Sequence, residues 1–470
     1  MDCEEVIVSQ SYAYEEIPKL YGLMDNSAIE STGALRLQNI PGLELKGNGI
    51  IIGIIDNRID AYHEAFRYSN GNTRILNVWN QQDSSLEPPE KFRYGSRINQ
   101  ETINEELQKE NSEILINLSR GSNHGTFLAG IAAGNLNVEK GLASPAPMAG
   151  IVVVKLKEAK DYLKSYYFLR LGAEAYQEND IINGIVYINQ IADEMKMPVI
   201  ICIPLGTNQG SHGGLSVIGD FINSYGSRTG IGIVCAMGNE GNSRNHYSGL
   251  ITKADDYDDV QLRVGANVEG ISLEIWGQSP DIFEVEIISP TGKRVKRVQS
   301  SSGQEEVYRL LFERTTIYVK YEFIGEETYF LKPDPFNTLT KPADSYIPIS
   351  VGAYNNADGS LYINTSRGYP TDMDVKPTFV APGVNVLGPG PNNSYIRLSG
   401  TSISAAITAG VMAQFMEWGI VKGNKINLNT TEIKNYRIRG SERKAGITFP
   451  NREWGFGTLD AYNSIDVLRG

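Results

Sequence analysis

Four polar residues in this chain are of types that together carry out nucleophilic chemistry. In chain order they are Asp56, His124, Asn239 and Ser402. A serine hydroxyl becomes a nucleophile when a neighbouring imidazole accepts its proton, and a carboxylate can hold that imidazole in the required tautomer. An asparagine amide can donate a hydrogen bond to the oxyanion that forms when a carbonyl group is attacked. The four side chains would therefore suffice for acyl transfer if the fold brought them together.

Ser402 and His124 each open a run of small and aliphatic residues, "SISAAITAG" (402–410) and "HGTFLAGIAAG" (124–134). A capping hydroxyl explains the serine as well as a nucleophile does, because serine is favoured at helix N-termini. A helix starting there would also direct backbone N–H groups at an oxyanion. His124 is either a capping or packing histidine or a general base. We expect the helix N-terminus to lower its pKa and keep the imidazole neutral.

Asp56 ends the apolar run "IIIGIID" (50–56), and Asn239 lies in "AMGNEGN" (236–242), after a second apolar run. The aspartate could form an Asx turn or cap the next segment, and the asparagine could be a turn residue. Alternatively, Asp56 orients an imidazole and Asn239 donates to an oxyanion. A carboxylate at the end of a buried strand needs a partner, because burying an unpaired charge is costly.

The elements that must position these residues alternate between strand and helix. Short runs rich in Val and Ile predict buried strands, and longer periodic segments between them predict helices. This alternation indicates an α/β fold with a parallel sheet, in which ligands bind at the carboxyl ends of the strands. The predicted strands are 49–56, 149–156, 198–205 and 230–237, and the predicted helices are 124–134, 179–195 and 214–229.

The pattern changes to alternating apolar and polar residues over 253–339, which predicts an inserted antiparallel β-sandwich, jelly-roll-like in character. The α/β pattern returns at "YIPISVGAY" (346–354), and a hydrophilic insertion occupies 81–114. The expected organisation has four parts. They are an N-terminal extension or prosegment remnant (1–20), the first part of the α/β domain (21–252), the sandwich (253–339) and the second part (340–470).

Composition limits the partners of this chain of 470 residues. Its 41% hydrophobic and 21% charged residues are typical of a soluble globular protein. A net charge of −12 argues against nucleic acid as a partner, and no apolar run approaches the ~18 residues of a membrane span. The acidic N-terminus lacks the layout of a signal peptide. Among three cysteines, Cys202 and Cys235 lie in strand-like runs and are expected to be buried hydrophobes.

The order Asp, His, Asn, Ser and the segments around these residues resemble the subtilisin-like serine proteases. The resemblance implies that Ser402 is the nucleophile and His124 the general base and acid. It further implies that Asp56 orients the histidine, and that Asn239 and the Ser402 backbone N–H form an oxyanion hole. It covers about 49–410 apart from the insertions, and rests on "GIIDNRID", "NHGTFLAGIAAG", "ICIPLGTNQG", "AMGNEGN", "TSRGYP", "KPTFVAPGVNV" and "SGTSISAAITAG". An α/β hydrolase acting on small esters is disfavoured, because Ser402 lacks a "GxSxG" elbow.

The same resemblance implies a substrate-binding S1 pocket between two strand ends, made by Pro204, Leu205, Gly206, Ala236, Met237 and Gly238. The segment that contains Pro204, Leu205 and Gly206 would also pair with an extended substrate as an added strand. The chain departs from the family in having Asn57 after the aspartate, and Ile403, Ala406 and Ile407 after the serine, without losing a catalytic atom. The loop "GNLNVEKGLA" (134–143) is poor in oxygen ligands, so we expect no metal and no other cofactor.

The insertions and loops are most similar to a clostridial subset, the Csp germination proteases. This likeness implies a selective endopeptidase acting on a protein or peptide, such as the proenzyme of a spore-cortex hydrolase, in a cytoplasmic or spore-associated setting. It also leaves open a non-catalytic pseudoprotease that binds or signals in germination. Three alternatives remain for a prosegment: it acts in cis, it acts in trans, or folding proceeds without one.

Overall fold

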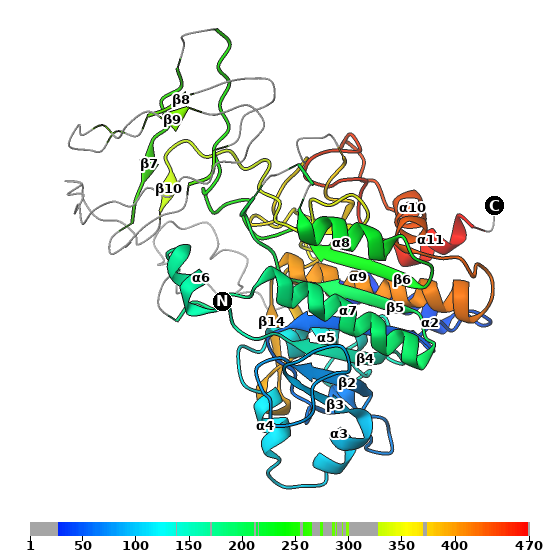
Figure 1. Cartoon of the computed structure of the whole chain (residues 1–470). Coiled ribbons are helices and arrows are strands. Elements are labelled where there is room, and N and C mark those ends of the chain that lie inside the picture. The colour runs from blue at the N-terminus through cyan, green and yellow to red at the C-terminus, as the bar shows by residue number, and fades with distance from the viewer. Residues whose placement is uncertain are drawn as a thin grey trace, which may run out of the picture.

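Eight strands form one sheet in the computed structural model of this chain, in the order β12-β11-β6-β5-β1-β4-β2-β3 (Figure 1). The structure describes residues 27–137, 139–169, 172–210, 213–214, 216–253, 257–265, 328–369 and 374–468, with short stretches between 273 and 299. The eight strands are β1 (Ile51–Asp56), β2 (Ile75–Asn80), β3 (Ser96–Asn99), β4 (Gly150–Lys155), β5 (Val199–Ile203), β6 (Ile231–Ala236), β11 (Ile349–Tyr354) and β12 (Phe379–Pro382). Neighbouring strands are parallel except β2 and β3. The predicted α/β fold with a mostly parallel sheet is confirmed.

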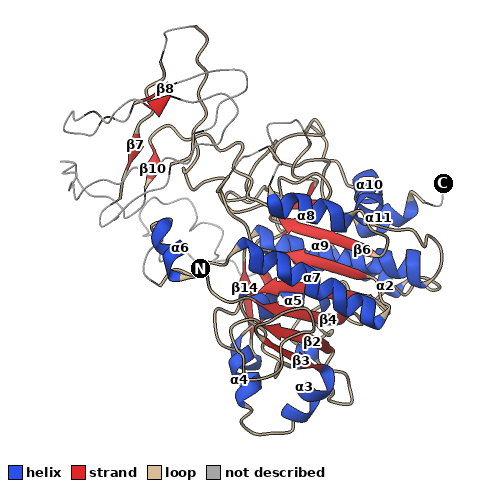
Figure 2. Cartoon of the chain, viewed as in Figure 1, coloured by secondary structure: helices blue, strands red, loops and turns tan. Residues whose placement is uncertain are grey.

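Helices cover both faces of the sheet (Figure 2). Helices α5 (His124–Ala133) and α9 (Thr401–Met416) pack on one face, and α7 (Glu178–Met195) and α8 (Val217–Gly226) on the other. Side chains of β1 alternate between these two cores: Ile52 and Ile54 join the first, Ile51 and Ile55 the second. This alternation explains why the strand reads as a continuous apolar run, because both of its faces are buried. Residues of α1 (Ser27–Glu30), α2 (Ala34–Asn39), α10 (Thr430–Gly440) and α11 (Ala461–Asp466) also belong to the first core.

Helix α9 is buried on all sides, and every residue from Thr401 to Met416 is shielded from solvent. Several of its polar side chains form internal hydrogen bonds, while Gln414 Oε1 is buried without a partner. Ser404 Oγ donates to the Ala381 carbonyl at 3.0 Å, and Gln414 Nε2 donates to the carbonyls of Ala34 and Leu45 at 3.0 and 2.9 Å. The residues by which this segment departs from the family pattern, Ile403, Ala406 and Ile407, are core residues.

The hydrophilic stretch 81–114 and the few residues after it contain elements that the sequence pattern did not predict. Strand β3 pairs antiparallel with β2 at the sheet edge, and α3 (Gln100–Glu106) and α4 (Glu113–Leu118) follow it. Asn99 and Ser112 cap these helices, accepting hydrogen bonds from Thr102 N–H at 2.9 Å and Leu115 N–H at 3.1 Å. The stretch therefore extends the sheet and leads towards His124.

Strands β6 and β11 lie side by side in the sheet, although the segment predicted as a sandwich separates them in sequence. Within that segment the structure describes two short antiparallel pairs. They are β7 (Leu262–Arg263) with β10 (Tyr329–Phe330), and β8 (Glu284–Val285) with β9 (Val298–Gln299). Most of 253–339 and all of 1–20 lie outside the described residues, so the sandwich and the N-terminal extension stay predictions. Among the helices that the structure does describe, none has both the length and the apolarity of a membrane span.

The two strand cysteines are buried as predicted. Cys202 on β5 and Cys235 on β6 are inaccessible to solvent, and neither forms a disulfide. Burial raises the pKa of both thiols, which keeps them protonated and unreactive.

Candidate active site

Three elements bring Asp56, His124 and Ser402 together at the carboxyl edge of the sheet. Asp56 is the last residue of β1, His124 the first of α5, and Ser402 the second of α9. His124 Nδ1 lies 2.8 Å from Asp56 Oδ2, and His124 Nε2 lies 3.0 Å from Ser402 Oγ. With the proton on Nδ1, the histidine donates to the carboxylate, and Nε2 accepts from the serine hydroxyl. This geometry can transfer the hydroxyl proton to the imidazole.

Gly125 allows α5 to approach the end of β1 this closely. A Cβ atom at position 125 would lie 2.3 Å from the Arg58 carbonyl oxygen and 2.8 Å from the Asp56 Cβ. Both distances are far shorter than a van der Waals contact, so any larger residue would push His124 away from its carboxylate partner. Position 125 therefore requires glycine, because only a residue without a side chain fits there.

The Asp56 carboxylate is buried and both of its oxygens are used. Oδ2 faces His124, and Oδ1 accepts the backbone N–H of Asn57 at 2.8 Å. The Asn57 side chain turns away from this carboxylate and donates to Ser122 Oγ at 2.6 Å and Glu174 Oε2 at 3.0 Å. The residue that departs from the family pattern thus connects the loop before His124 to a second carboxylate.

The loop that leads into His124 is tied down at several points. Lys155, opposite Asp56 in the β1–β4 register, donates to the carbonyls of Asn117 and, at 3.0 Å, Arg120. Asn123 Nδ2 donates to the Pro389 carbonyl at 2.8 Å. Burial and two nearby arginines lower the pKa of Lys155 to about 8. These bonds fix the backbone on which the imidazole is carried.

The environment of His124 raises its pKa, contrary to the expectation from its position at a helix N-terminus. Burial alone would lower this pKa, but the charge and hydrogen bond of Asp56, together with the charge of Glu174, outweigh it. A full negative charge in hydrogen-bonding contact acts more strongly than the roughly half charge of a helix end. The prediction of a lowered pKa was therefore wrong.

Asn239 is oriented by the first residue of α9. Its Oδ1 accepts the Thr401 N–H at 3.0 Å, and the Thr401 hydroxyl accepts the Gly238 N–H at 3.1 Å. A Cβ atom on Gly400 would lie 3.5 Å from Asn239 Nδ2 and 3.4 Å from Ser402 Oγ, so both atoms border one small space. The Ser402 N–H belongs to the first helical turn and has no acceptor within the helix. Asn239 Nδ2 and Ser402 Oγ therefore lie on two sides of the same small space, as the predicted oxyanion role of Asn239 requires.

The residues predicted to line a substrate pocket lie at and just after the ends of two neighbouring strands. Pro204 to Gly206 follow β5, and Ala236 to Gly238 end and follow β6, which is paired with β5. Gly206 is exposed, Leu205 half-buried and Pro204 buried. Met237 is fully buried and its side chain belongs to the core beneath, so its thioether does not face solvent.

Two residues beside the site, Glu174 and Thr340, were not predicted. Glu174 is held by Asn57 and by the Tyr176 hydroxyl at 3.2 Å, and Thr340 donates its N–H to the Met237 carbonyl at 3.0 Å. Both lie in irregular segments and belong to no motif, so only the meeting of distant segments reveals them.

His63 stands apart from the catalytic candidates. Its Nδ1 accepts the Ala65 N–H at 3.1 Å, and its Nε2 donates to the Ser394 carbonyl at 3.0 Å, so both ring nitrogens bond to backbone groups and the role is structural. His212 lies outside the described residues. Within the described ranges, no group of three or more His, Cys, Asp or Glu side chains is placed to hold a metal ion.

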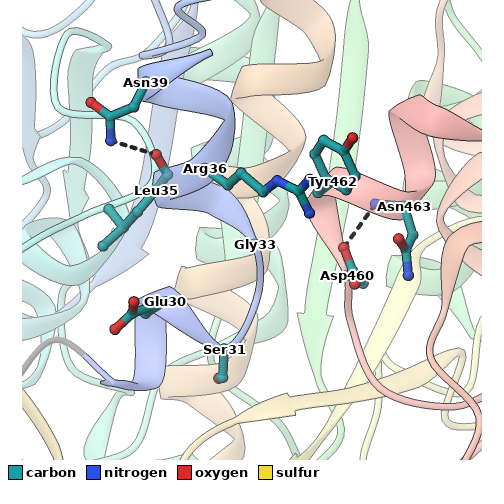
Figure 3. A pocket seen from close by; sticks show the side chains of 9 residues that line it. All are labelled: Glu30, Ser31, Gly33, Leu35, Arg36, Asn39, Asp460, Tyr462 and Asn463. Atoms are coloured by element: carbon teal, nitrogen blue, oxygen red, sulfur yellow. Dashed lines mark hydrogen bonds between the residues drawn. The ribbon is translucent and has the colours of Figure 1, made fainter.

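A cavity of about 530 Å³ lies between α2 and α11 (Figure 3). The Arg36 guanidinium stacks 3.4 Å from the centroid of the Tyr462 ring, and Asp460 accepts the Asn463 N–H at 2.8 Å. None of the residues that line it belongs to the Asp56–His124–Ser402 group. This cavity is therefore distinct from the candidate active site.

A family model of known proteins matches most of this chain. The model described as "Subtilase family" matches residues 47–260 and 325–457. The solved structure of the Clostridium perfringens CspB protease is 26% identical with a TM-score of 0.79, over 94% of this chain and 97% of that one. The gap between the two matched ranges falls within the predicted insertion.

Curated relatives match over shorter stretches. A subtilisin-like protease, SBT6.1 of Arabidopsis thaliana, is 30% identical over 141 residues, which are 28% of this chain and 13% of that protein. The C5a peptidase of Streptococcus pyogenes is 37% identical over 83 residues, 17% of this chain and 7% of its own length. The aligned part is thus a small fraction of both relatives.

Proposed function

Since this chain belongs to the subtilase family and is a subtilisin-like serine endopeptidase, we propose that it cleaves peptide bonds through an acyl-enzyme on Ser402. The observation that carries this proposal is the position of His124, in hydrogen-bond contact with Asp56 on one side and Ser402 on the other. Asp56, His124 and Ser402 form the proposed catalytic triad.

In the acylation step, Ser402 Oγ attacks the substrate carbonyl carbon while its proton moves to His124 Nε2. The imidazolium that forms is stabilised by the Asp56 carboxylate. The oxygen of the former carbonyl becomes negative and accepts hydrogen bonds from Asn239 Nδ2 and the Ser402 N–H. His124 then donates its Nε2 proton to the leaving amine, the C–N bond breaks, and an ester on Ser402 remains.

Deacylation repeats this sequence with water. His124 accepts a proton from the water molecule as its oxygen attacks the ester carbonyl, and the same two donors bind the oxyanion. The proton returns to Ser402 Oγ as the C–O bond breaks, which releases the carboxylic acid product. Glu174 holds Asn57 in place beside Asp56, and its charge helps to stabilise the imidazolium.

A serine-directed fluorophosphonate tests the proposal, because it reacts only with a serine whose hydroxyl is activated. We expect it to label the folded chain at Ser402, as located by peptide mass spectrometry, and an unfolded sample to remain unlabelled. Absence of labelling in folded protein would favour the alternative, a pseudoprotease that binds or signals in germination. The intact contacts among Asp56, His124 and Ser402 argue against that alternative.

We further propose a selective enzyme that activates a proenzyme, such as that of a spore-cortex hydrolase, in the cytoplasm or on the spore. The likeness to a clostridial Csp protease over nearly the whole chain supports this choice. A prosegment acting in cis or in trans would be a further partner, while nucleic acid and membranes would not. Incubation with such a proenzyme should yield one defined cleavage, and digestion at many unrelated sites would contradict selectivity.

The raised pKa of His124 predicts how the rate depends on pH. The imidazole must be neutral to accept the serine proton, so kcat/KM falls as the pH drops through its pKa. Replacing Glu174 with glutamine removes a negative charge that raises this pKa, so we expect the acidic limb to move to lower pH. The measurement is kcat/KM against pH on one peptide.

Tyr176→Phe is a matched control for this experiment, because it removes one hydrogen bond to Glu174 but keeps the carboxylate charge. For the Tyr176→Phe enzyme, the acidic limb of kcat/KM against pH should stay at the wild-type position. The shift in the Glu174→Gln enzyme should shrink at high salt, because Glu174 is solvent-exposed and its charge is screened. If the acidic limb of the Glu174→Gln enzyme does not move at low salt, the charge of Glu174 does not act on the pKa of His124.

A further inference from the structure

Two glycines at the strand ends beside Ser402 face one threonine from a distant segment. A Cβ atom on Gly206 would lie 2.2 Å from Thr340 Oγ1 and 2.8 Å from Thr340 Cβ. A Cβ atom on Gly238 would lie 2.6 Å from Thr340 Cγ2 and 2.8 Å from its Oγ1. Real atoms do not approach this closely, so the threonine side chain fills the space between the two segments and requires glycine in both.

Thr340 is held in this position by its backbone and by its hydroxyl. Its N–H and Oγ1 both donate to the Met237 carbonyl, at 3.0 and 3.3 Å, and it is only 4% exposed. The next residue, Lys341, exchanges two backbone hydrogen bonds with Thr207, at 2.8 and 3.0 Å. The segment is thus bonded to the continuations of both β5 and β6 and cannot withdraw from between them.

A buried ion pair anchors the same segment from below. Lys341 Nζ lies 2.9 Å from Asp344 Oδ2, and the two side chains are 10% and 1% exposed. Breaking a pair of this kind leaves an uncompensated buried charge, which is strongly unfavourable. Thr340 is therefore part of a rigid floor and not of a loop that could move aside for a substrate.

This floor lies where a substrate side chain would enter. The segment Ala236–Gly238 leads directly into Asn239, whose Nδ2 borders the same small space as Ser402 Oγ. A residue whose carbonyl oxygen binds there, the P1 residue on the acyl side of the cleaved bond, projects its side chain between this segment and Pro204–Gly206. We propose that Thr340 closes the base of this pocket and restricts P1 to small side chains such as glycine, alanine and serine. This inference rests on the proposed function.

A peptide series that differs only at P1 tests the proposal, with alanine, serine, leucine and phenylalanine compared by kcat/KM. The wild-type enzyme should prefer alanine and serine. Thr340→Ala removes the hydroxyl and the methyl group and should raise the leucine-to-alanine ratio about 10-fold or more, because each methylene accommodated in a pocket changes the rate by 10- to 200-fold. Thr340→Val is the matched control: it keeps the shape, loses the hydroxyl, and should keep the wild-type preference.

Fluorophosphonate labelling of each variant separates this inference from the proposed function. Retained labelling with an unchanged P1 preference in Thr340→Ala would overturn the role of Thr340 alone. A wild-type preference for leucine or phenylalanine would overturn it as well. If the folded wild-type chain is neither labelled by the fluorophosphonate nor able to cleave the peptides, the proposed function is overturned, and this inference with it.

Discussion

Replacing Ser402 with alanine is expected to lower kcat by about 10⁶, the scale of the loss when the nucleophile is removed from subtilisin itself. Without Oγ no ester can form, and His124 has no hydroxyl proton to accept. The oxyanion donors and the substrate-binding segments are unchanged, so KM should change little. The residual rate above that in water reflects binding and the oxyanion donors alone.

Ser404 offers a matched control in the same helix. It is also a buried serine, but its hydroxyl donates to the carbonyls of Ala381 and Pro382 and has no contact with His124. Ser404→Ala should therefore destabilise the fold by about 1–3 kcal/mol, the cost of leaving a buried acceptor unpaired, and keep fluorophosphonate labelling. Equal activity in wild-type and Ser402→Ala enzymes, assayed on the same peptide, would exclude Ser402 as the nucleophile.

Replacing Asp56 with asparagine is expected to lower kcat by about 10⁴ at neutral pH with the fold intact. The amide has the size of the carboxylate, and its oxygen can still accept the Asn57 N–H. Its NH₂ group, however, would donate to His124 Nδ1 and leave the proton on Nε2, where it blocks transfer from Ser402. The negative charge that stabilises the imidazolium is lost as well.

Single-turnover kinetics on an activated ester and the melting temperature together test this expectation. The acylation rate should fall, while the melting temperature should stay close to that of the wild type. Asp60→Asn is the control, since Asp60 is a neighbouring buried carboxylate whose oxygen accepts the Tyr62 N–H. A comparable loss of rate in both variants would show that Asp56 acts through local packing and not through His124.

The elements that carry the candidate site residues could be located from sequence because their patterns are unambiguous. The run predicted as strand 49–56 is β1, Ile51–Asp56, and the helix predicted at 124–134 is α5, His124–Ala133. Buried parallel strands and small-residue helices have strong signals. Strand and helix ends alone left each residue with a structural alternative, and the grouping of Asp56, His124 and Ser402 came from the resemblance to the subtilisin-like proteases.

What could not be predicted depends on contacts between segments far apart in the chain. Thr340 reaches Gly206 and Gly238 across more than one hundred residues of sequence, and nothing in "LTKPADS" indicates a pocket floor. Glu174 lies in a polar loop, and its effect on His124 arises from spatial proximity. The wrong sign for the His124 pKa has the same origin, because a helix end is visible in sequence and a neighbouring charge is not.

Helix α9 has no solvent-facing side, and this has a consequence for how the proposed nucleophile, Ser402, would be lost on heating. A surface helix can fray or detach while the rest of a domain stays folded. Here, displacing Ser402 means extracting sixteen buried residues from the middle of the protein, which we expect to be among the most costly local openings of this fold. We therefore expect Ser402, the proposed nucleophile, to belong to a late-opening cooperative unit, so that heat inactivation is coupled to global unfolding.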